Sequence, residues 1–217
     1  MTSVLEKIYS PRHALKNSLG GGSSAFESER VSQFVEWLGS PKKVLDIGCR
    51  DGRVARALLA AGHTVTGFDI DSAALALCPP EMKTEQHDLN DDWYVGHEGE
   101  FDIVIATEVV EHLYYPDKVL GRIYSVLKPG GMFLGSVPNP FNVKNRFRLF
   151  FARIENTPLA EPTHINHFSY RALGRLLRSR FENVFITGVG RPRFRRLARS
   201  LPGLMGSTFV FKGQKPF

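Results

Sequence analysis

The stretch from Lys43 to Gly52, KVLDIGCRDG, constrains the fold of this chain more than any other. It begins with the short apolar run of an inner β-strand. It ends in a turn that contains Gly48 and Gly52, which let the backbone turn sharply and approach a bound molecule. Residues 54–61 then have the pattern of a helix leaving the turn. A strand, a glycine turn and a helix predict the first half of a nucleotide-binding βαβ unit, with its ligand at the turn.

The spacing around this turn differs from that of dinucleotide-binding proteins. Asp46 lies two residues before the first glycine, and the pattern is Gly48-x-Arg50-x-Gly52 instead of G-x-G-x-x-G. A carboxylate here suits an amino group better than a pyrophosphate. The stretch resembles the first motif of class I S-adenosylmethionine (SAM) dependent methyltransferases, acid-x-Gly-x-Gly-x-Gly. Arg50 replaces the middle glycine, so we expect either a less close backbone approach or a guanidinium that faces the methionine carboxylate.

Two further acids follow predicted strands. Residues 63–71 alternate like a strand, and Asp69 at its tip stands 23 residues after Asp46, near the spacing of about 20 at which a carboxylate accepts both ribose hydroxyls. Residues 84–90 predict a short third strand that ends at Asp88. The resemblance implies that Asp88 accepts from the adenine amino group and that the backbone of Leu89 meets the ring edge.

The remaining elements continue the same pattern. We expect a helix at 26–38, strands at 101–106 and 132–137, a helix at 117–127, a KPGG turn at 128–131, a helix at 169–180, and strands at 182–190 and 207–213. The resemblance runs through residues 43–137. It implies an α/β, Rossmann-like doubly wound, mostly parallel seven-stranded sheet. We expect a flexible N-terminal segment (1–25) before one methyltransferase domain (26–217), with a basic aromatic insert at about 139–168.

Composition and charge indicate the cellular location and the kinds of partner that we expect. No apolar run approaches the roughly 20 residues that span a bilayer, and the first thirty residues lack a signal-peptide core, so we expect a cytoplasmic protein with two free thiols. Residues 1–140 carry a net charge of −6 and residues 141–217 a net charge of +12. This asymmetry favours either an anionic partner or a solvated basic face. In residues 141–154 aromatic and basic side chains alternate, which predicts either an extra helix packed on the core or contact with a membrane or hydrophobic substrate.

The segment TEVVEHL, residues 107–113, follows the fourth strand directly, and the ligand crevice of such sheets lies outside the carboxyl ends of the strands. Glu108, Glu111 and His112 have the spacing of one face of a helical turn. Three interpretations remain open. His112 is a general base oriented by Glu111, or the three bind a divalent metal ion with His164 or His167, or they only line the pocket.

Two branches of the family resemble this segment. Quinone-biosynthesis O-methyltransferases carry E-x-x-E-H here and a basic, apolar membrane-touching insert after strand five, which FNVKNRFRLFF resembles. Small-RNA 2′-O-methyltransferases also carry E-x-x-E-H and hold a metal ion with it. The first branch is the closer in motif pattern, and residues 26–217 contain no separate RNA-binding module, so a nucleic-acid substrate is the less favoured alternative.

The sequence therefore predicts SAM-dependent methylation, most simply O-methylation of a small or lipid-like acceptor, with peripheral membrane contact through 141–154. The alternatives are a metal-assisted RNA 2′-O-methyltransferase and a non-catalytic SAM-binding protein. The predicted site residues are catalytic His112 and Glu111; SAM-binding Asp46, Gly48, Arg50, Gly52, Asp69, Ile70, Asp88, Leu89 and Thr107; substrate-side Asn139, His164 and His167; and, if a metal ion binds, Glu108, Glu111, His112 and His167.

Overall fold

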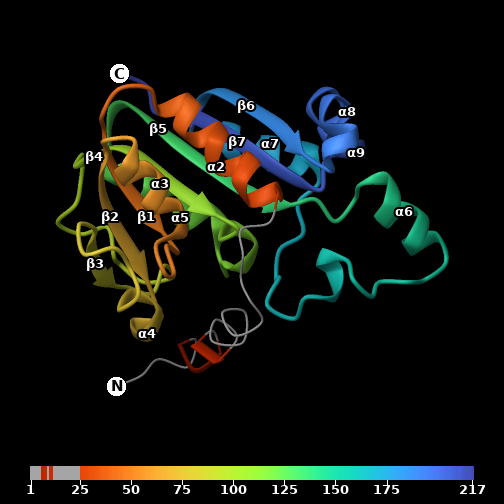
Figure 1. The fold of residues 1–217 in the computed structure, drawn as a ribbon, viewed down its shortest axis with the longest axis horizontal. Helices are drawn as coiled ribbons and strands as arrows, with labels where there is room; N and C mark the ends of the chain where they lie inside the picture. Colours follow the sequence, from red (N-terminus) through yellow and green to blue (C-terminus); the bar gives the residue numbers. More distant parts are fainter. Residues whose placement is uncertain (1–5, 9, 12–24) are drawn as a thin grey trace.

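The computed structural model describes residues 6–8, 10–11 and 25–217. Seven strands form one sheet in the order β3-β2-β1-β4-β5-β7-β6 (Figure 1). The first five strands are parallel, whereas β7 pairs antiparallel with both β5 and β6. The predicted class I methyltransferase fold is thereby confirmed. Its strands are β1 (Lys43–Ile47), β2 (Thr64–Asp69), β3 (Lys83–Gln86), β4 (Phe101–Thr107), β5 (Leu127–Pro138), β6 (Glu182–Val189) and β7 (Thr208–Gln214).

Helices cover both faces of the sheet, as the nearly continuous apolar runs of its inner strands require. One core cluster joins the sheet to α2 (Ala25–Leu38) and α3 (Arg53–Ala60), through side chains such as Phe34 and Leu58. The other joins it to α5 (Pro116–Val126) and α7 (Tyr170–Arg178), through side chains such as Leu120 and Leu173. The sheet is thus held from both sides, and the loops after its strands are left to build a site.

The KPGG segment does not form a turn between two elements. It lies inside β5, which starts at Leu127, and the pairing with β4 jumps from Phe101–Leu127 to Ile103–Met132. The extra residues bulge out of the ladder at Gly130, whose φ of 74° is in the left-handed region that glycine adopts without strain. The third strand also ends earlier than expected, at Gln86, so Asp88 and Leu89 lie in the loop beyond it.

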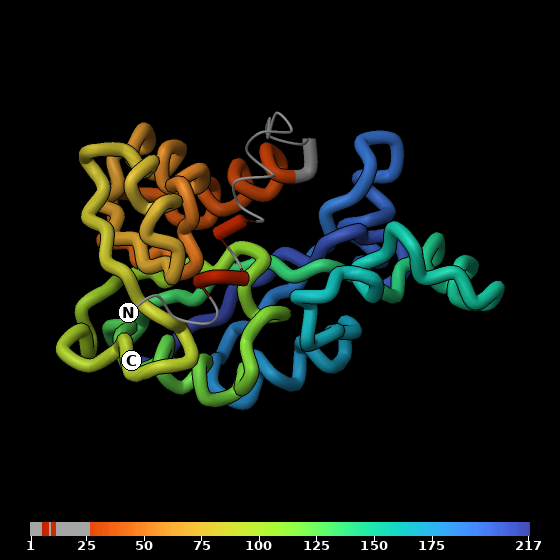
Figure 2. Tube along the Cα trace, turned by 90° about the horizontal axis from the view of Figure 1, so that it is seen from below, coloured from red at the N-terminus to blue at the C-terminus, as the bar shows by residue number. Residues whose placement is uncertain are grey.

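The insert after β5 forms α6 (Val143–Phe150) and a short 3₁₀ turn (Pro158–Ala160), and it projects away from the sheet (Figures 1 and 2). Its aromatic side chains do not pack on the core, because Phe147 is 68% exposed and Phe150 is 82% exposed. Asn142 caps the helix by accepting from the backbone of Asn145. The basic stretch 191–200 becomes mostly helical, with α8 (Arg195–Ser200) followed by α9 (Pro202–Met205), and both helices pack on β6.

The N-terminal segment predicted to be flexible lies mostly outside the described residues. Of its described part, Glu6 accepts a hydrogen bond of 2.9 Å from the Ser72 hydroxyl at the start of α4 (Ser72–Leu75). No helix in the described part of the chain is long and apolar enough to cross a membrane. Cys49 and Cys78 are free thiols, as expected.

Candidate active site

The glycine turn after β1 has the backbone geometry that its sequence predicts. Gly48, Arg50 and Gly52 all have positive φ, at 66°, 53° and 73°. A Cβ on Gly48 would lie 2.5 Å from a methyl carbon of Val109, so only glycine fits there. Arg50 adopts the left-handed conformation without being glycine, which costs about 1 kcal/mol or more. The turn is therefore built to present backbone to the space in front of it.

Asp46 is the most electrostatically unusual residue of the turn. Its side chain is 1% exposed, and Oδ2 has no hydrogen-bond partner among the described residues. Burial raises the pKa of this carboxyl to about 8, and the neighbouring Asp69 and Cys78 add to the effect. A buried carboxylate of this kind needs a cationic partner. An ammonium group bound in front of the turn would supply it.

Asp69 ends β2 and is tied to the glycine turn. Its Oδ2 accepts from the backbone N–H of Arg50 (2.8 Å) and its Oδ1 from that of Asp71 (2.9 Å). Each carboxylate oxygen has a second lone pair, so the group can still accept from two neighbouring hydroxyls. Asp71 itself caps α4, since it accepts from the backbone of Ala73 and Ala74. The ribose role predicted for Asp69 thus has an acceptor held in a defined orientation.

These groups border one cavity of about 750 Å³, which lies outside the carboxyl ends of the strands. Eight of the nine predicted SAM-binding residues line it: Asp46, Gly48, Arg50, Asp69, Ile70, Asp88, Leu89 and Thr107. The ninth, Gly52, is not among the lining residues, and a Cβ there would lie 2.7 Å from Pro79. Two residues of α2, Glu27 and Arg30, also line the cavity.

The catalytic candidates stand at the same cavity. Val109 precedes a 3₁₀ turn, Val110–His112, and the Nδ1 atom of His112 is 2.7 Å from the carbonyl oxygen of Thr163. A carbonyl only accepts, so Nδ1 carries a proton, and in the neutral form of this tautomer the lone pair is on Nε2. Glu111 is buried, and its Oε1 lies 4.0 Å from that Nε2. An imidazole so placed can take up a proton at Nε2 beside a carboxylate.

His164 is the second histidine at this point of the cavity. Its ring lies edge-on to that of His112, with centroids 4.8 Å apart, and its Nδ1 is 3.0 Å from the carbonyl oxygen of Pro158. Burial lowers the pKa of His164, so its ring is neutral near pH 7. Glu111, His112 and His164 each offer one ligand atom within 4.8 Å of the others.

The comparisons with known proteins agree with this geometry. A family model described as "Methyltransferase domain" matches residues 24–182. The chain belongs to this methyltransferase family. A ubiquinone biosynthesis O-methyltransferase of Thiobacillus denitrificans is 36% identical over 104 residues, which are 45% of either chain. One of Pseudomonas savastanoi is 32% identical over 117 residues, which are 51% of this chain and 50% of the relative. The matches thus span about half the length of these curated relatives.

Solved structures share the fold at low sequence identity. A SAM-dependent methyltransferase from Archaeoglobus fulgidus has a TM-score of 0.68 at 18% identity, over 88% of this chain and 95% of its own. A Burkholderia thailandensis 1,6-didemethyltoxoflavin N1-methyltransferase has a TM-score of 0.69 at 21% identity, over 99% of this chain and 88% of its own. Both structures are of methyltransferases, and both share the sheet architecture described above.

Two predicted site residues of the methyltransferase, Glu108 and His167, lie elsewhere than expected. Glu108 does not share a helical face with Glu111 and His112, because its own φ is 54° and the 3₁₀ turn starts two residues later. Its carboxylate contacts the Ser136 hydroxyl (2.8 Å) and Arg30 (3.2 Å). His167 is exposed and is not among the residues that line the cavity. His164, not Glu108 or His167, completes the group with metal-binding potential.

Asn139, which was predicted on the substrate side, is not among the residues that line the cavity. Asn139 is fully buried, and its amide nitrogen donates to the carbonyls of Pro202, Gly203 and Gly206 at 3.2, 3.3 and 2.8 Å. Its Oδ1 accepts from the backbone of Phe141 at 3.0 Å. The side chain therefore joins the start of the insert to α9. The sequence did not reveal this position because an Asn between two prolines after a strand has the same sequence pattern in either role.

Of the loop residues 161–166, only His164 was predicted from the sequence, and the others were missed. Glu161, Pro162 and Thr163 line the cavity with His164. Asn166 joins the loop to the 3₁₀ turn Val110–His112, which we call the catalytic turn. Its backbone N–H donates to the carbonyl of Glu111 (2.9 Å) and its side-chain amide to the carbonyl of Leu113 (2.6 Å). No sequence signal joins segments more than fifty residues apart, so only the fold reveals these contacts.

Proposed function

We propose that the protein transfers the methyl group of SAM to a hydroxyl of a small or lipid-like acceptor. The observation that carries this proposal is the hydrogen bond between His112 Nδ1 and the Thr163 carbonyl, within a cavity that also contains Asp46 and Asp69. It orients an imidazole as a base where the acceptor would meet the cofactor. The partial relatives named ubiquinone biosynthesis O-methyltransferases support oxygen as the acceptor atom.

The residues of the cavity fit the cofactor. The buried, unpartnered Oδ2 of Asp46 matches an ammonium group, Asp69 offers two oriented acceptors to a ribose, and Asp88 with Leu89 borders the same space for the adenine. Arg50 lines the cavity and is assigned to the methionine carboxylate. SAM supplies an activated methyl group, so the protein needs no nucleophile of its own.

The protein's own task is to orient the acceptor, exclude water and take up its proton. Unperturbed aromatic hydroxyls have pKa values of about 10, as in tyrosine, within reach of a histidine base. Nε2 of His112 accepts the hydroxyl proton, and the nearby Glu111 carboxylate stabilises the resulting imidazolium. The loop 161–166 closes the cavity beside this pair. Thr107 and Leu113 provide part of the remaining wall.

A metal-assisted transfer is the second candidate. It is favoured by one observation, the convergence of ligand atoms from Glu111, His112 and His164. Two imidazoles and a carboxylate suit Zn²⁺ or a similar ion, which would polarise the acceptor hydroxyl. The base and metal mechanisms differ in one respect that is simple to measure, since only the second is lost on chelation.

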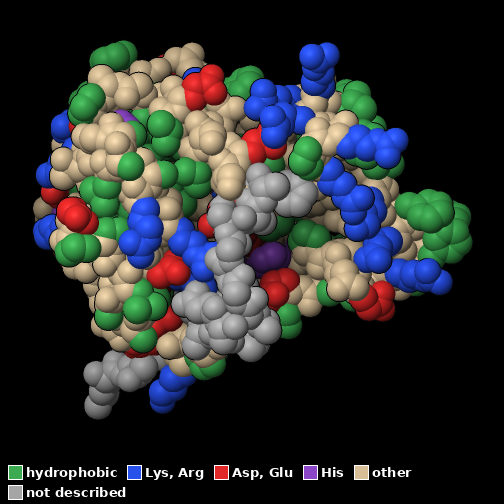
Figure 3. Space-filling view, viewed as in Figure 1, with side chains coloured by type: hydrophobic (Ala, Val, Ile, Leu, Met, Phe, Trp, Pro, Cys, Tyr) green, Lys and Arg blue, Asp and Glu red, His purple; other side chains and the backbone are tan. Residues whose placement is uncertain are grey.

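The insert supports the membrane contact that we assign to the protein. Exposed apolar side chains gather along α6 and the residues after it, next to Lys144, Arg146 and Arg153; Figure 3 shows apolar and basic side chains side by side at the end of the projecting segment. The apolar members are Val143, Phe147, Phe150, Phe151 and Ile154. Apolar anchors flanked by cations suit the interface of an anionic bilayer, from which a lipid-like acceptor would be drawn.

The decisive experiment follows labelled methyl groups from SAM into a whole-cell extract, with and without a chelator, and then separates organic, nucleic-acid and water-soluble fractions. Chelator-resistant label in the organic or small-molecule fraction is expected. The His112→Gln protein provides the matched control, because it should bind S-adenosylhomocysteine yet transfer little label. Chelator-sensitive label in RNA would replace this proposal with the metal-assisted RNA methyltransferase. Absence of S-adenosylhomocysteine binding would contradict both.

A further inference from the structure

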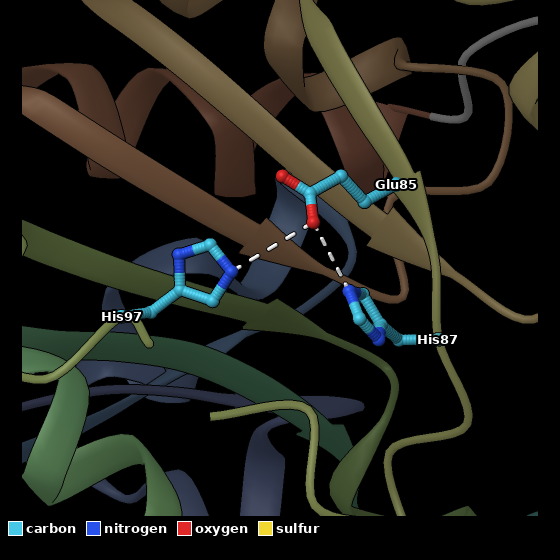
Figure 4. A group of neighbouring side chains, drawn as sticks. All are labelled: Glu85, His87 and His97. Carbon is cyan, nitrogen blue, oxygen red and sulfur yellow. Dashed lines mark hydrogen bonds and ion pairs between the residues drawn. The ribbon is translucent and has the colours of Figure 1, made fainter. Parts of the chain in front are cut away.

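A second group of histidines and a carboxylate lies at the outer strands of the sheet, apart from the catalytic turn. Glu85 comes from β3, His87 from the loop just beyond it, and His97 from the segment before β4 (Figure 4). Oε2 of Glu85 is 3.2 Å from Nε2 of His87 and 3.7 Å from Nε2 of His97. Three atoms that can bind a metal ion thus converge, all within 4.8 Å of one another.

The separations are those of a metal-ligand set. Zn²⁺ binds imidazole nitrogen and carboxylate oxygen at about 2.0–2.1 Å in tetrahedral geometry, which places its ligand atoms about 3.3 Å apart. The two distances from Oε2 of Glu85 to the histidine nitrogens, 3.2 and 3.7 Å, bracket this value. The three side chains are between 16% and 29% exposed, so an ion can enter from solvent and a water molecule can complete the coordination.

The protonation of His97 points the same way. Its Nδ1 lies 2.5 Å from Oε2 of Glu100, so this nitrogen carries a proton. The neutral ring then has its lone pair on Nε2, the atom that faces Glu85. A histidine that donates one N–H to a carboxylate while the other nitrogen binds a metal ion is the usual outer-shell arrangement of metal sites.

Two lysines contact the Oε1 atoms of Glu85 and Glu100, so the Oε2 atoms face the histidines. Lys83 contacts the other oxygen of Glu85, Oε1, at 2.8 Å, and Lys43 contacts Oε1 of Glu100 at 2.8 Å. Each carboxylate therefore divides its oxygens between a lysine on the outside and a histidine on the inside.

The group is also held rigidly. The phenyl ring of Phe68, fully buried in β2, packs against both imidazoles, with centroids 4.5 Å from His87 and 5.2 Å from His97. The backbone N–H of His87 donates to the carbonyl of Asp69 at 2.9 Å, and that of His97 to Tyr94 at 3.1 Å. Ligands on fixed backbone need little reorganisation to bind an ion.

From these contacts we propose that Glu85, His87 and His97 form a Zn²⁺ site, separate from the catalytic turn, that joins the end of β3 to the segment before β4. His87 stands directly before Asp88 and Leu89, and it borders the cofactor cavity. A bound ion would therefore fix the loop that we assign to the adenine. The role is structural, since no step of methyl transfer passes through the site.

The test titrates Zn²⁺ alone into chelator-treated, dialysed full-length protein and follows both calorimetric binding and the melting temperature. Wild-type protein is expected to bind one ion at this site and to melt about 5–10 °C higher at a hundredfold excess over the dissociation constant. Glu85→Gln and His97→Gln should bind at least tenfold more weakly and lose the shift. Glu100→Gln, which acts through His97, should weaken binding about tenfold or more.

The matched control is the double variant His112→Gln/His164→Gln, which removes the other histidine–carboxylate group. It should retain the affinity and the shift of the wild type. Unchanged binding in both Glu85→Gln and His97→Gln, loss of binding only in the double variant, or no saturable binding to wild-type protein would overturn the proposal. The Glu85→Gln and His97→Gln proteins should bind S-adenosylhomocysteine before zinc is added, which shows that they fold.

Discussion

The backbone N–H of Arg50 donates to Oδ2 of Asp69 across 2.8 Å, so the glycine turn after β1 and the tip of β2 are joined by a charge-assisted hydrogen bond. The left-handed φ of Arg50 directs this N–H toward β2. The cavity is therefore organised before any ligand enters. Its acceptors belong to two different strands but are held as one unit.

Asp69→Asn is expected to weaken S-adenosylhomocysteine binding at least tenfold and to destabilise the protein by about 1–3 kcal/mol. The amide has only one acceptor oxygen, so either Arg50 or Asp71 would lose its acceptor. Calorimetric titration and urea unfolding measure the two effects. Asp71→Asn is the control, because asparagine caps a helix as well as aspartate does. Equal affinity in Asp69→Asn and wild type would contradict the ribose assignment.

Asp46 should give the stability of the cofactor-free protein a distinctive pH dependence. Its carboxyl has a pKa of about 8 when folded and about 4 when unfolded, so the folded state binds the proton more tightly. This contribution is complete below about pH 4 and is lost as the pH rises through 8. Asp46→Asn has no charged form, so its stability relative to wild type should increase from pH 5 to pH 9. Urea unfolding at several pH values measures it, and a constant difference would contradict it.

The same carboxyl should release a proton when the cofactor binds near pH 7. An ammonium group beside Asp46 favours its ionised form and lowers its pKa. Calorimetric titration with S-adenosylhomocysteine in buffers of different ionisation enthalpy should show the release, and it should disappear in Asp46→Asn. A release that is the same in both proteins would assign it to another group.

His112→Gln should lower kcat by about 10²–10⁴-fold while S-adenosylhomocysteine affinity stays within about threefold. Glutamine can still donate to the Thr163 carbonyl but cannot accept the proton. His167→Gln is the matched control, since that histidine is exposed and lies outside the residues that line the cavity. Steady-state kinetics with a confirmed acceptor measure both. A kcat loss in His167→Gln as large as that in His112→Gln would favour a histidine brought in by loop motion.

Phe147→Ser/Phe150→Ser should reduce binding to anionic vesicles about tenfold or more without changing S-adenosylhomocysteine affinity. Both rings are exposed on α6, and their burial in a bilayer interface is the main apolar contribution that the insert can make. Vesicle co-sedimentation at two salt concentrations measures it. Val95→Ser, at an exposed site elsewhere, should bind like wild type. Equal sedimentation of the double variant and wild type would remove the membrane assignment.

Asn139→Ala should cost about 2–4 kcal/mol of stability and leave cofactor affinity unchanged. The substitution removes the Asn139 amide that donates to the carbonyls of Gly203 in α9 and Gly206 just after it, in a fully buried place. Asn142→Ala, which removes only the cap of α6, should cost about 1 kcal/mol. Urea unfolding compares the two. Similar costs in both variants would mean that Asn139 does not hold the insert to α9.

The sequence predicted the cofactor half of the cavity because its constraints are local. A glycine at positive φ and an acid at a strand tip are fixed by neighbours a few residues away, so Gly48, Asp46 and Asp69 could be assigned without a structure. Helix α2 is the exception, since its spacing predicted a helix but not that Arg30 would reach the cavity.

The acceptor half was harder because its contacts join distant segments. The spacing of Glu108 and His112 is helical, yet the backbone at Glu108 is left-handed, and its carboxylate contacts Ser136 instead. The contacts of Asn139 with α9 were not predicted, because burial cannot be inferred from one polar residue among prolines. The aromatic residues of α6 had two equally good explanations, and only their exposure separates them.

The backbone carbonyl of Thr163 gives the insert a second role. A backbone atom of the segment that encloses the acceptor also decides which nitrogen of His112 holds the proton. In the function that we propose, the insert therefore sets both the substrate preference and the protonated nitrogen of His112. A change to the insert alters both properties together. A chimera that borrows this segment from another methyltransferase would keep its catalytic power only where the graft offers a carbonyl at the same point, whatever side chains it carries.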